Sequence, residues 1–436
     1  MLVISDGPAD ADIVVVGAGA AGIAAARAGV RAGLKTLVLE ARDRVGGRAH
    51  TVPDGRGGAL DLGCEWLHSA DRNPLVGLAD ELGFTIDRSK PDWSTHAGPG
   101  FPPAELADFH AASDRFWTGL EQAAHGGGPD RAASALLEPG CRWNPLIDAI
   151  STYYNGVELD RVSIVDLDRY VDTGVNWRIA EGYGAFISAA AAALDVRTGC
   201  RVRTIDHSGR YVTVVSDAGA VTARAVIVTV PTNLLANGGI AFAPDLPRHR
   251  EAAALLPLGL ADKLFFAIAE GADVPSGHLF GSTDRVGTIS FDLRPGGRPF
   301  VHGYAGGAFA RSLERGGARA FEAEARSQLT AMLGSDLLKK IIFLRATAWD
   351  SDPFAQGAYS HALPGCADMR EILAAPVDDR LFFAGEACSR DFFSTAHGAW
   401  QSGSEAASAV IGRLQKGRNP LRSSALDHRS KREKSQ

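Results

Sequence analysis

The feature that most constrains the fold is a glycine-rich run that follows a short apolar segment. The run VVVGAGAAG places Gly17, Gly19 and Gly22 in a G-x-G-x-x-G pattern. The apolar segment 12–16 has the length of a strand, and the alanine-rich stretch 20–32 is typical of a helix. The first glycine permits a tight turn, the second admits a pyrophosphate to the backbone, and the third lets helix and strand pack closely. The run therefore predicts a phosphate site at a helix N-terminus.

The residues after this run supply the rest of the expected context. A second predicted strand, 36–40, ends in Glu40, whose carboxylate suits ribose hydroxyls and would repel a 2′-phosphate. The run 44–48, RVGGR, follows, and its two glycines form a turn between two arginines that can neutralise a diphosphate. A chance glycine turn followed by a solvated basic loop is the structural alternative, but the order of these features favours a dinucleotide site.

Three separated segments resemble one known family, the flavin-containing amine oxidases, which include monoamine oxidases, polyamine and spermine oxidases, and lysine-specific histone demethylases. They are LEARDRVGGR (39–48), LDLGCEWLH (60–68) and LFFAGEACSRDFFSTAHGAWQSGSEAA (381–407). The detail of the last segment is most similar to polyamine and spermine oxidases. The resemblance covers most of the chain and fades over 91–142. It implies an α/β fold (α+β overall), with a Rossmann-type FAD-binding domain and a discontinuous substrate domain of mixed sheet and helices.

We expect both domains to be discontinuous. The FAD-binding domain is expected to contain 1–85, 190–258 and 370–416, and the substrate-binding domain 86–189 and 259–369. Apolar runs and turn signals predict further strands at 201–205, 211–216, 225–230, 263–269 and 381–384, and a helix at 398–414. The region 91–140 is expected to form helices with loops. The basic tail 417–436 is expected to be disordered, with a nucleic-acid-binding tail as the alternative.

The resemblance implies that FAD is held by residues from all three segments and from the regions between them. Glu40 and Arg42 would hold the adenosine ribose, and Arg48 would approach the pyrophosphate and flavin. Glu386 would bind the ribityl or pyrophosphate portion, and Val202 would offer its backbone to adenine. A plain structural role is the alternative for each, and is strongest for Val202. The full expected set is Gly17, Gly19, Ala21, Gly22, Glu40, Ala41, Arg42, Gly47, Arg48, Gly63, Glu65, Trp66, Val202, Trp349, Glu386, Thr395 and Ala396.

The resemblance also implies Lys263, Tyr359, Thr395 and His68 as catalytic residues. Lys263 matches the family lysine that reaches flavin N5 through a water, although a lysine on an apolar strand can also extend to solvent. Tyr359 matches an aromatic residue beside the flavin, as does Trp349. Thr395 replaces the second tyrosine of the monoamine oxidase cage, so a bulkier or secondary amine is expected.

Two further positions refine these expectations. His68 either contacts the second amine of a substrate or caps a turn, and the unusual Glu65 has no assigned role. Ala358 stands where covalently flavinylated relatives carry cysteine, so FAD is expected to be bound non-covalently.

The expected reaction is oxidation of an amine, such as a polyamine or secondary amine, by hydride transfer to flavin N5. The imine hydrolyses, and O2 is reduced to H2O2. Three alternatives stay open: an L-amino acid oxidase, a C–C desaturase or protoporphyrinogen-type oxidase, and a non-catalytic flavin-stabilised binding protein. The sequence does not indicate which amine is used or the oligomeric state.

Composition narrows the other possibilities. The net charge of −6 argues against a nucleic-acid partner and slightly favours cationic substrates. Five scattered cysteines without a C-x-x-C pair indicate neither a disulfide framework nor a metal site. No run approaches the roughly 18 apolar residues of a membrane span, and no secretory signal is recognisable. A cytoplasmic location is therefore expected.

Overall fold

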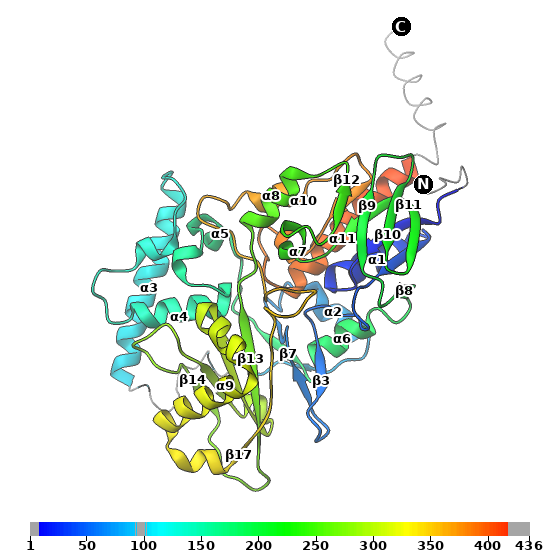
Figure 1. Ribbon diagram of the computed structural model, residues 1–436. Coiled ribbons are helices and arrows are strands. Elements are labelled where there is room, and N and C mark those ends of the chain that lie inside the picture. Colours follow the sequence, from blue (N-terminus) through cyan, green and yellow to red (C-terminus); the bar gives the residue numbers. More distant parts are fainter. Residues whose placement is uncertain (1–7, 92, 94–100, 102, 417–436) are drawn as a thin grey trace, which may run out of the picture.

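The computed structural model describes residues 8–91, 93, 101 and 103–416, and two large sheets organise it (Figure 1). The first sheet has eight strands in the order β12-β9-β10-β11-β1-β2-β8, and β18 also pairs with β11. Its strands are β1 (Ala11–Val16), β2 (Thr36–Leu39), β8 (Val196–Arg197), β9 (Val202–Asp206), β10 (Val212–Ser216), β11 (Gly219–Val228), β12 (Ala241–Ala243) and β18 (Leu381–Phe383).

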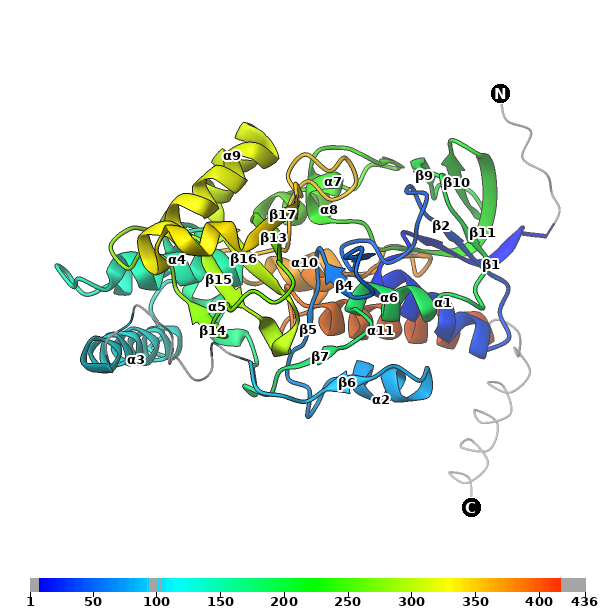
Figure 2. The ribbon, with the colours of Figure 1, turned by 90° about the horizontal axis from the view of Figure 1, so that it is seen from below.

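The centre of this sheet is parallel and covered on both faces. β1 pairs in parallel with β2 and β11, and β11 pairs in parallel with β18. Helix α1 (Ala20–Arg31) packs along α11 (Ala396–Lys416) on one face, as Figure 2 shows. β1 is almost wholly buried, which explains its continuous apolar sequence. This arrangement confirms the expected α/β fold with a dinucleotide-binding domain.

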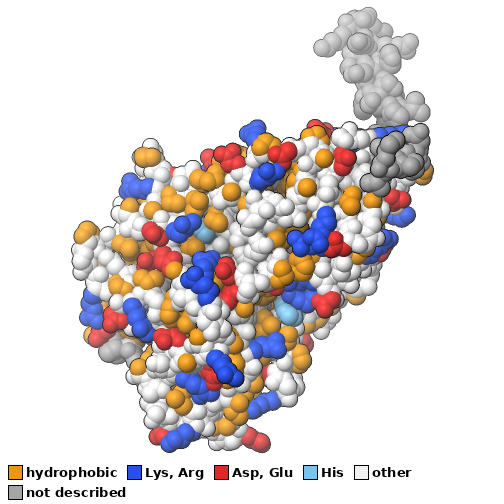
Figure 3. All heavy atoms as spheres, viewed as in Figure 1, with side chains coloured by type: hydrophobic (Ala, Val, Ile, Leu, Met, Phe, Trp, Pro, Cys, Tyr) orange, Lys and Arg blue, Asp and Glu red, His pale blue; other side chains and the backbone are white. Residues whose placement is uncertain are grey.

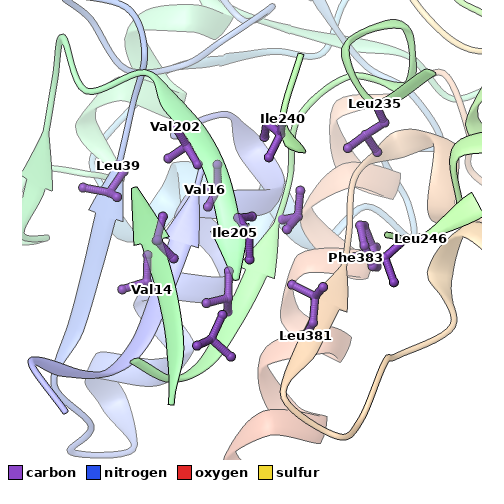
Figure 4. Packing of buried hydrophobic residues seen from close by; sticks show 14 of the residues in the cluster. Val14, Val16, Leu39, Val202, Ile205, Leu235, Ile240, Leu246, Leu381 and Phe383 are labelled. Carbon is purple, nitrogen blue, oxygen red and sulfur yellow. The ribbon is translucent and has the colours of Figure 1, made fainter. Parts of the chain in front are cut away.

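The core on the other face of the sheet combines strands from distant parts of the chain. Val14 and Val16 of β1 pack with Ile205 of β9 and with Leu381 and Phe383 of β18 (Figure 4). Leu235 and Leu246 close this cluster from α7 (Thr232–Ala236) and from the residue before α8 (Pro247–Leu255). The first and last strands of the sheet are therefore joined in one hydrophobic core.

The second sheet is antiparallel, with five strands in the order β14-β15-β16-β13-β17. The long helix α9 (Gly307–Leu333) packs against three strands of this sheet, β13, β16 and β17. All eight residues of β13 are buried, so both faces of this strand are covered. The strands are β13 (Ala261–Ile268), β14 (Gly277–Leu279), β15 (Ser290–Leu293), β16 (Phe300–Gly306) and β17 (Ile341–Ala346).

Two small sheets, β3-β4 and β5-β7-β6, lie beside the large sheets, and a helical region adjoins the second large sheet (Figures 1 and 2). Among the described helices, none is long and apolar enough to cross a membrane. Figure 3 shows acidic and basic side chains interspersed over the face in view. The remaining elements are β3 (Thr51–Pro53), β4 (Ala59–Asp61), β5 (Trp66–Leu67), β6 (Ile86–Asp87), β7 (Trp177–Ile179), α2 (Pro74–Glu81), α3 (Pro103–His125), α4 (Asn144–Asn155), α5 (Ile164–Arg169), α6 (Tyr183–Ala189) and α10 (Met369–Ala374).

Most strands expected from the sequence are found within one or two residues of their predicted ends. The exception is β11, which begins at Gly219 and ends at Val228, whereas the prediction was 225–230. Its first four residues are exposed or only partly buried and pair with β10, so this part of the strand lacks the apolar run that marks its second half. The predicted tail 417–436 lies outside the described residues. The division into domains remains a prediction. β7 and α6, which it assigns to the substrate-binding domain, pack in one core with α2, which it assigns to the FAD-binding domain.

Candidate active site

The glycine-rich turn has the geometry of a pyrophosphate site. Gly17 has φ 103°, and a Cβ on Gly22 would lie 1.9 Å from the Gly17 carbonyl oxygen, so both positions exclude a side chain. A Cβ on Gly19, in contrast, would have nothing within 4 Å. Gly19 therefore faces open space directly before the first turn of α1, where Ala21 is buried. Gly17 and Gly22 shape the turn, and Gly19 leaves room for an anion at the helix N-terminus.

Glu40 lies beside this turn at the end of β2. Its Oε2 accepts a hydrogen bond from Ala18 N at 2.7 Å, and its Oε1 accepts one from Arg42 N at 2.8 Å. Ala41, between Glu40 and Arg42, is partly buried. A Cβ on Gly47 would lie 3.3 Å from the Gly19 Cα, so the second motif lies against the first. The two motifs predicted to bind one cofactor are thus adjacent.

The Arg42 side chain connects this region with a distant loop. Its guanidinium donates to both carboxylate oxygens of Asp352, at 2.6 and 2.8 Å, and lies 5.5 Å from the Phe354 ring centroid. Because Asp352 already binds this guanidinium, a ribose bound by Arg42 would have to share the group with Asp352. Val202, the residue expected to face adenine, is buried in β9.

Glu386 is the centre of a buried polar cluster. Its carboxylate accepts from Arg48 Nη1 at 3.0 Å, from Ser360 Oγ at 2.6 Å and from Ser394 N at 2.9 Å. Burial raises the pKa of Glu386, but Arg48 and the hydrogen bonds outweigh it, so the pKa is lowered and the group stays ionised. The sequence predicted that Arg48 and Glu386 share one site, and the structure places them in contact.

Gly63 marks a close approach between two chain segments. A Cβ there would lie 1.7 Å from the Arg48 carbonyl oxygen and 3.3 Å from Trp349 Cζ2. The Trp349 indole donates to the Leu62 carbonyl oxygen at 3.1 Å. Three of the predicted cofactor residues, Arg48, Gly63 and Trp349, are therefore packed together.

Lys263 points into this region from β13 and is 5% exposed. Its Nζ donates to the Asp61 carbonyl oxygen at 3.1 Å and to Glu65 Oε2 at 3.0 Å. The alternative that this lysine extends to solvent is therefore wrong. A buried ammonium needs a partner that carries negative charge, and Glu65 is that partner.

Glu65, which had no assigned role, is the counter-ion of a buried cationic group. Besides Lys263, it is 3.3 Å from Arg178 Nε, 3.4 Å from Arg298 Nη2 and 3.6 Å from His302 Nδ1. Burial raises the pKa of Glu65, but Lys263, His302 and the arginines together hold it well below its usual value. The carboxylate stays ionised and its cationic partners occupy it, so it is not free to receive a substrate ammonium.

Three tyrosines form a group, and one of them, Tyr304, lies next to Lys263. The Tyr359 hydroxyl donates to the Tyr153 carbonyl oxygen and is 3.1 Å from the Tyr304 hydroxyl. Lys263 Nζ lies 5.9 Å from the Tyr304 ring centroid. Sequence reasoning found Tyr359 but missed Tyr304, which is directly opposite Lys263 on β16. The alternation of β16 would have identified it only if the pairing of β13 with β16 had been known.

The other predicted residues have partners of their own. The Thr395 hydroxyl donates to Phe392 O at 2.7 Å and accepts from Gly398 N at 3.0 Å, so it caps α11, which begins at Ala396. His68 Nδ1 is 2.7 Å from Asn176 Oδ1, and burial lowers the His68 pKa. The Trp66 ring lies 3.7 Å below the Arg178 guanidinium.

The glycine-rich turn, Glu40 and the Arg48–Glu386 cluster fit FAD, because they offer an open helix N-terminus, a ribose acceptor and a cation at one sheet edge. With a buried lysine and tyrosines beside Gly63, they define the chain as a flavin-dependent oxidoreductase. The family model described as flavin containing amine oxidoreductase matches residues 20–117 and 103–411, so the chain belongs to that family.

Individual relatives agree with this assignment. Polyamine oxidase 4 of Oryza sativa subsp. japonica is 31% identical over 441 residues, which cover 93% of this chain and 90% of that protein. Lysine-specific histone demethylase 1 homolog 2 of Arabidopsis thaliana is 30% identical over 448 residues, which cover 92% of this chain and 58% of that protein.

Solved structures support the fold. Cyclohexylamine oxidase from Brevibacterium oxydans IH-35A has a TM-score of 0.74 at 22% identity, over 94% of this chain and all of that chain. Putrescine oxidase bound to putrescine has a TM-score of 0.71 at 22% identity, over 92% of this chain and 99% of that chain. The expected family and cofactor are therefore confirmed.

Proposed function

We propose that the chain oxidises a polyamine or another secondary amine to an imine, which hydrolyses, and reduces O2 to H2O2. The observation that carries this proposal is the buried Lys263 ammonium, held by Glu65 and the Asp61 carbonyl oxygen beside Tyr304 and Tyr359. A lysine that is only 5% exposed and paired with Glu65 is costly to bury, which argues for a role in the reaction and against a plain binding protein.

When bound, FAD supplies the redox chemistry, because its ring accepts a hydride from the carbon next to the amine nitrogen. The protein would provide orientation and a dry site. Tyr304 and Tyr359 present apolar rings that exclude water, which favours the neutral, reactive form of the amine. Thr395, tied to the helix cap, is smaller than a tyrosine and leaves room for a substituent on the nitrogen.

Non-covalent binding of FAD is also proposed. Ala358, which carries no nucleophile, has its carbonyl oxygen bonded to Arg48 Nη1 at 2.6 Å. A flavin released by acid or heat, with an unmodified mass for the protein, would support this; a protein mass increased by one FAD would refute it.

A carboxylate near His68 supports a substrate with a second ammonium. Asp172 is exposed, and its charge opposes the lowering of the His68 pKa that burial causes. It also contributes, after burial, to the raised pKa of Tyr170. Glu181, the other acid considered from the sequence, accepts a hydrogen bond from Thr85 N instead. The polyamine oxidases and putrescine oxidase among the similar proteins are in keeping with this substrate class.

A second candidate is an amine that carries a carboxylate, such as an L-amino acid. Arg178 is buried, and its Nη2 has no hydrogen-bond partner among the described residues. A guanidinium N–H of this kind can bind a carboxylate oxygen. The sequence alone offered no cation for this role.

The deciding experiment is an anaerobic titration of the purified, FAD-loaded protein with amines while the flavin absorbance is recorded. The panel contains monoamines, putrescine, spermidine, spermine, their acetyl forms and L-amino acids, with Lys263→Met as the matched variant. Bleaching by polyamines supports the proposal, and bleaching by amino acids alone supports the second candidate. A flavin that no amine bleaches would refute both. The expected cytoplasmic location is a separate proposal, which cell fractionation tests.

A further inference from the structure

Buried titratable side chains form a row across the second sheet that starts at Lys263. His302 on β16 is directly opposite Asp292 on β15, and Asp292 is directly opposite His278 on β14. Side chains in such pairs have Cβ atoms about 4.5–5.5 Å apart. His278 Nδ1 lies 2.8 Å from Asp292 Oδ1, and His302 Nδ1 lies 3.6 Å from Glu65 Oε2. Since the same Glu65 oxygen bonds Lys263, the row extends from β13 to the edge strand. Hydrogen bonds join its two ends, Lys263–Glu65 and Asp292–His278, whereas His302 lies between them as a close neighbour without a hydrogen bond among the described residues.

The row leads from a buried end to a partly exposed one. Lys263, Glu65, His302 and Asp292 are all buried, whereas His278 is partly exposed on β14, the edge strand. Side chains of this kind are costly inside a protein unless they are paired. Apolar side chains would pack on the same strands without the free-energy cost of burying charged groups. These paired groups should therefore have a role other than packing.

His302 is the residue in this row that could pass a proton from one neighbour to the next. Its ring stacks on Phe265, with centroids 5.0 Å apart, and its Nε2 is buried without a hydrogen-bond partner among the described residues. Burial lowers the pKa of His302 to about 4, so the ring is neutral at pH 7. A neutral imidazole can accept a proton on one nitrogen and release the proton on the other.

The charged groups around His302 come from several elements. Glu65 and Asp292 raise its pKa, while Lys263 and Arg298 lower it, and burial outweighs all four. Asp292 stays ionised: burial raises its pKa, but the hydrogen bond and charge of His278 lower it further. An ionised carboxylate therefore lies on each side of a neutral ring.

The proposed reaction needs such a path. Oxidation of an amine by O2 moves two electrons and two protons, giving imine and H2O2. A hydride carries both electrons and one proton, so the second proton must travel separately through the protein.

We propose that Glu65, His302, Asp292 and His278 form a proton relay between Lys263 and solvent at the edge of the second sheet. A proton passes from His278 to Asp292 and, through a bridging water, on to His302 Nε2. The Nδ1 proton then moves to Glu65, and Glu65 returns it to Lys263 after Lys263 has given a proton to the oxygen that becomes H2O2; no electron moves. The relay rests on the proposed function, because that reaction supplies the proton to be moved.

The first test measures reoxidation of the reduced flavin by O2 in stopped flow, in H2O and D2O. His302→Gln and Asp292→Asn should slow it by roughly tenfold or more and enlarge the solvent isotope effect. Imidazole added to His302→Ala should restore part of the rate. His249→Gln, on α8, is the control and should leave it unchanged. Wild-type rates and isotope effects in both relay variants, or no rescue by imidazole, would overturn the relay.

A second test needs no turnover. In the resting protein, the His302 ring proton should exchange with water despite its burial, measured by NMR of 15N-labelled histidine. Asp292→Asn should slow that exchange at least several-fold, while equal exchange in both proteins would overturn the relay. If no amine bleaches the flavin, the proposed function fails, and this exchange still decides the relay.

Discussion

Of the three glycines in the N-terminal turn, Gly17 and Gly22 should be required for folding, and Gly19 for binding FAD. Gly19→Ala places a methyl group where nothing lies within 4 Å, at an ordinary φ of −79°. Alanine restricts the unfolded chain, which stabilises by about 0.4–1 kcal/mol. Alanine is also a poorer N-cap residue than glycine, and this destabilises the folded protein by a similar amount. The free energy of unfolding without FAD should thus change by less than about 0.5 kcal/mol.

FAD affinity should respond much more strongly to the same substitution. A pyrophosphate oxygen that accepts from a backbone N–H lies about 2.9 Å away, so a methyl group in the open space displaces it. Losing one charge-assisted hydrogen bond costs about 1.5–3 kcal/mol. The Kd for FAD, measured by quenching of flavin fluorescence, should rise roughly 10- to 150-fold.

Gly22→Ala provides the contrast. Its Cβ would lie 1.9 Å from the Gly17 carbonyl oxygen, so the backbone must move and the FAD-free protein should lose about 1–3 kcal/mol or more. Urea unfolding of both variants without FAD checks this difference. A Gly19→Ala protein that binds FAD like the wild type would refute the placement of the pyrophosphate.

Three further results are expected. Asp166→Asn breaks the fully buried pair with Arg370, with contacts of 2.6 and 2.8 Å, and should cost about 3–5 kcal/mol in urea unfolding; a loss below 1 kcal/mol would contradict it. Burial lowers the pKa of His361 to about 3, so the unfolded chain binds its proton first and stability falls as the pH drops below 6.5. His361→Leu should remove about 1 kcal/mol of the loss between pH 6.5 and 5.5, and an unchanged pH dependence would argue against it. Asp172→Asn should raise KM for diamines about two- to fivefold without changing KM for monoamines, in steady-state assays.

Local patterns were sufficient to predict the dinucleotide fold. Gly17 is required by its positive φ, and Gly22 by the Gly17 carbonyl oxygen five residues earlier, so a spacing rule captures both. The Arg48–Glu386 contact joins residues far apart in the chain, and it was predictable only through the resemblance to a family.

The roles of Glu65 and Tyr304 could not be predicted in the same way. Tyr304 depends on the pairing of β16 with β13, and Glu65 on a contact between the residue before β5 and β13; contacts over such long separations leave no local pattern in the sequence. Arg178 likewise reaches Glu65 only because β7 pairs with β5. The charges around Lys263 are therefore a product of tertiary structure.

The late position of β18 and α11 in the chain has a consequence for biosynthesis. While the ribosome makes the chain, β1 and α1 emerge early, but α11, which packs along α1, and β18, which pairs with β11, follow only near residue 400. At 5–20 residues per second, that delay is about 20–80 s. The nascent nucleotide fold must stay soluble for that time with an exposed apolar face. Protection by a chaperone during translation should therefore limit how much of the protein is recovered in soluble form.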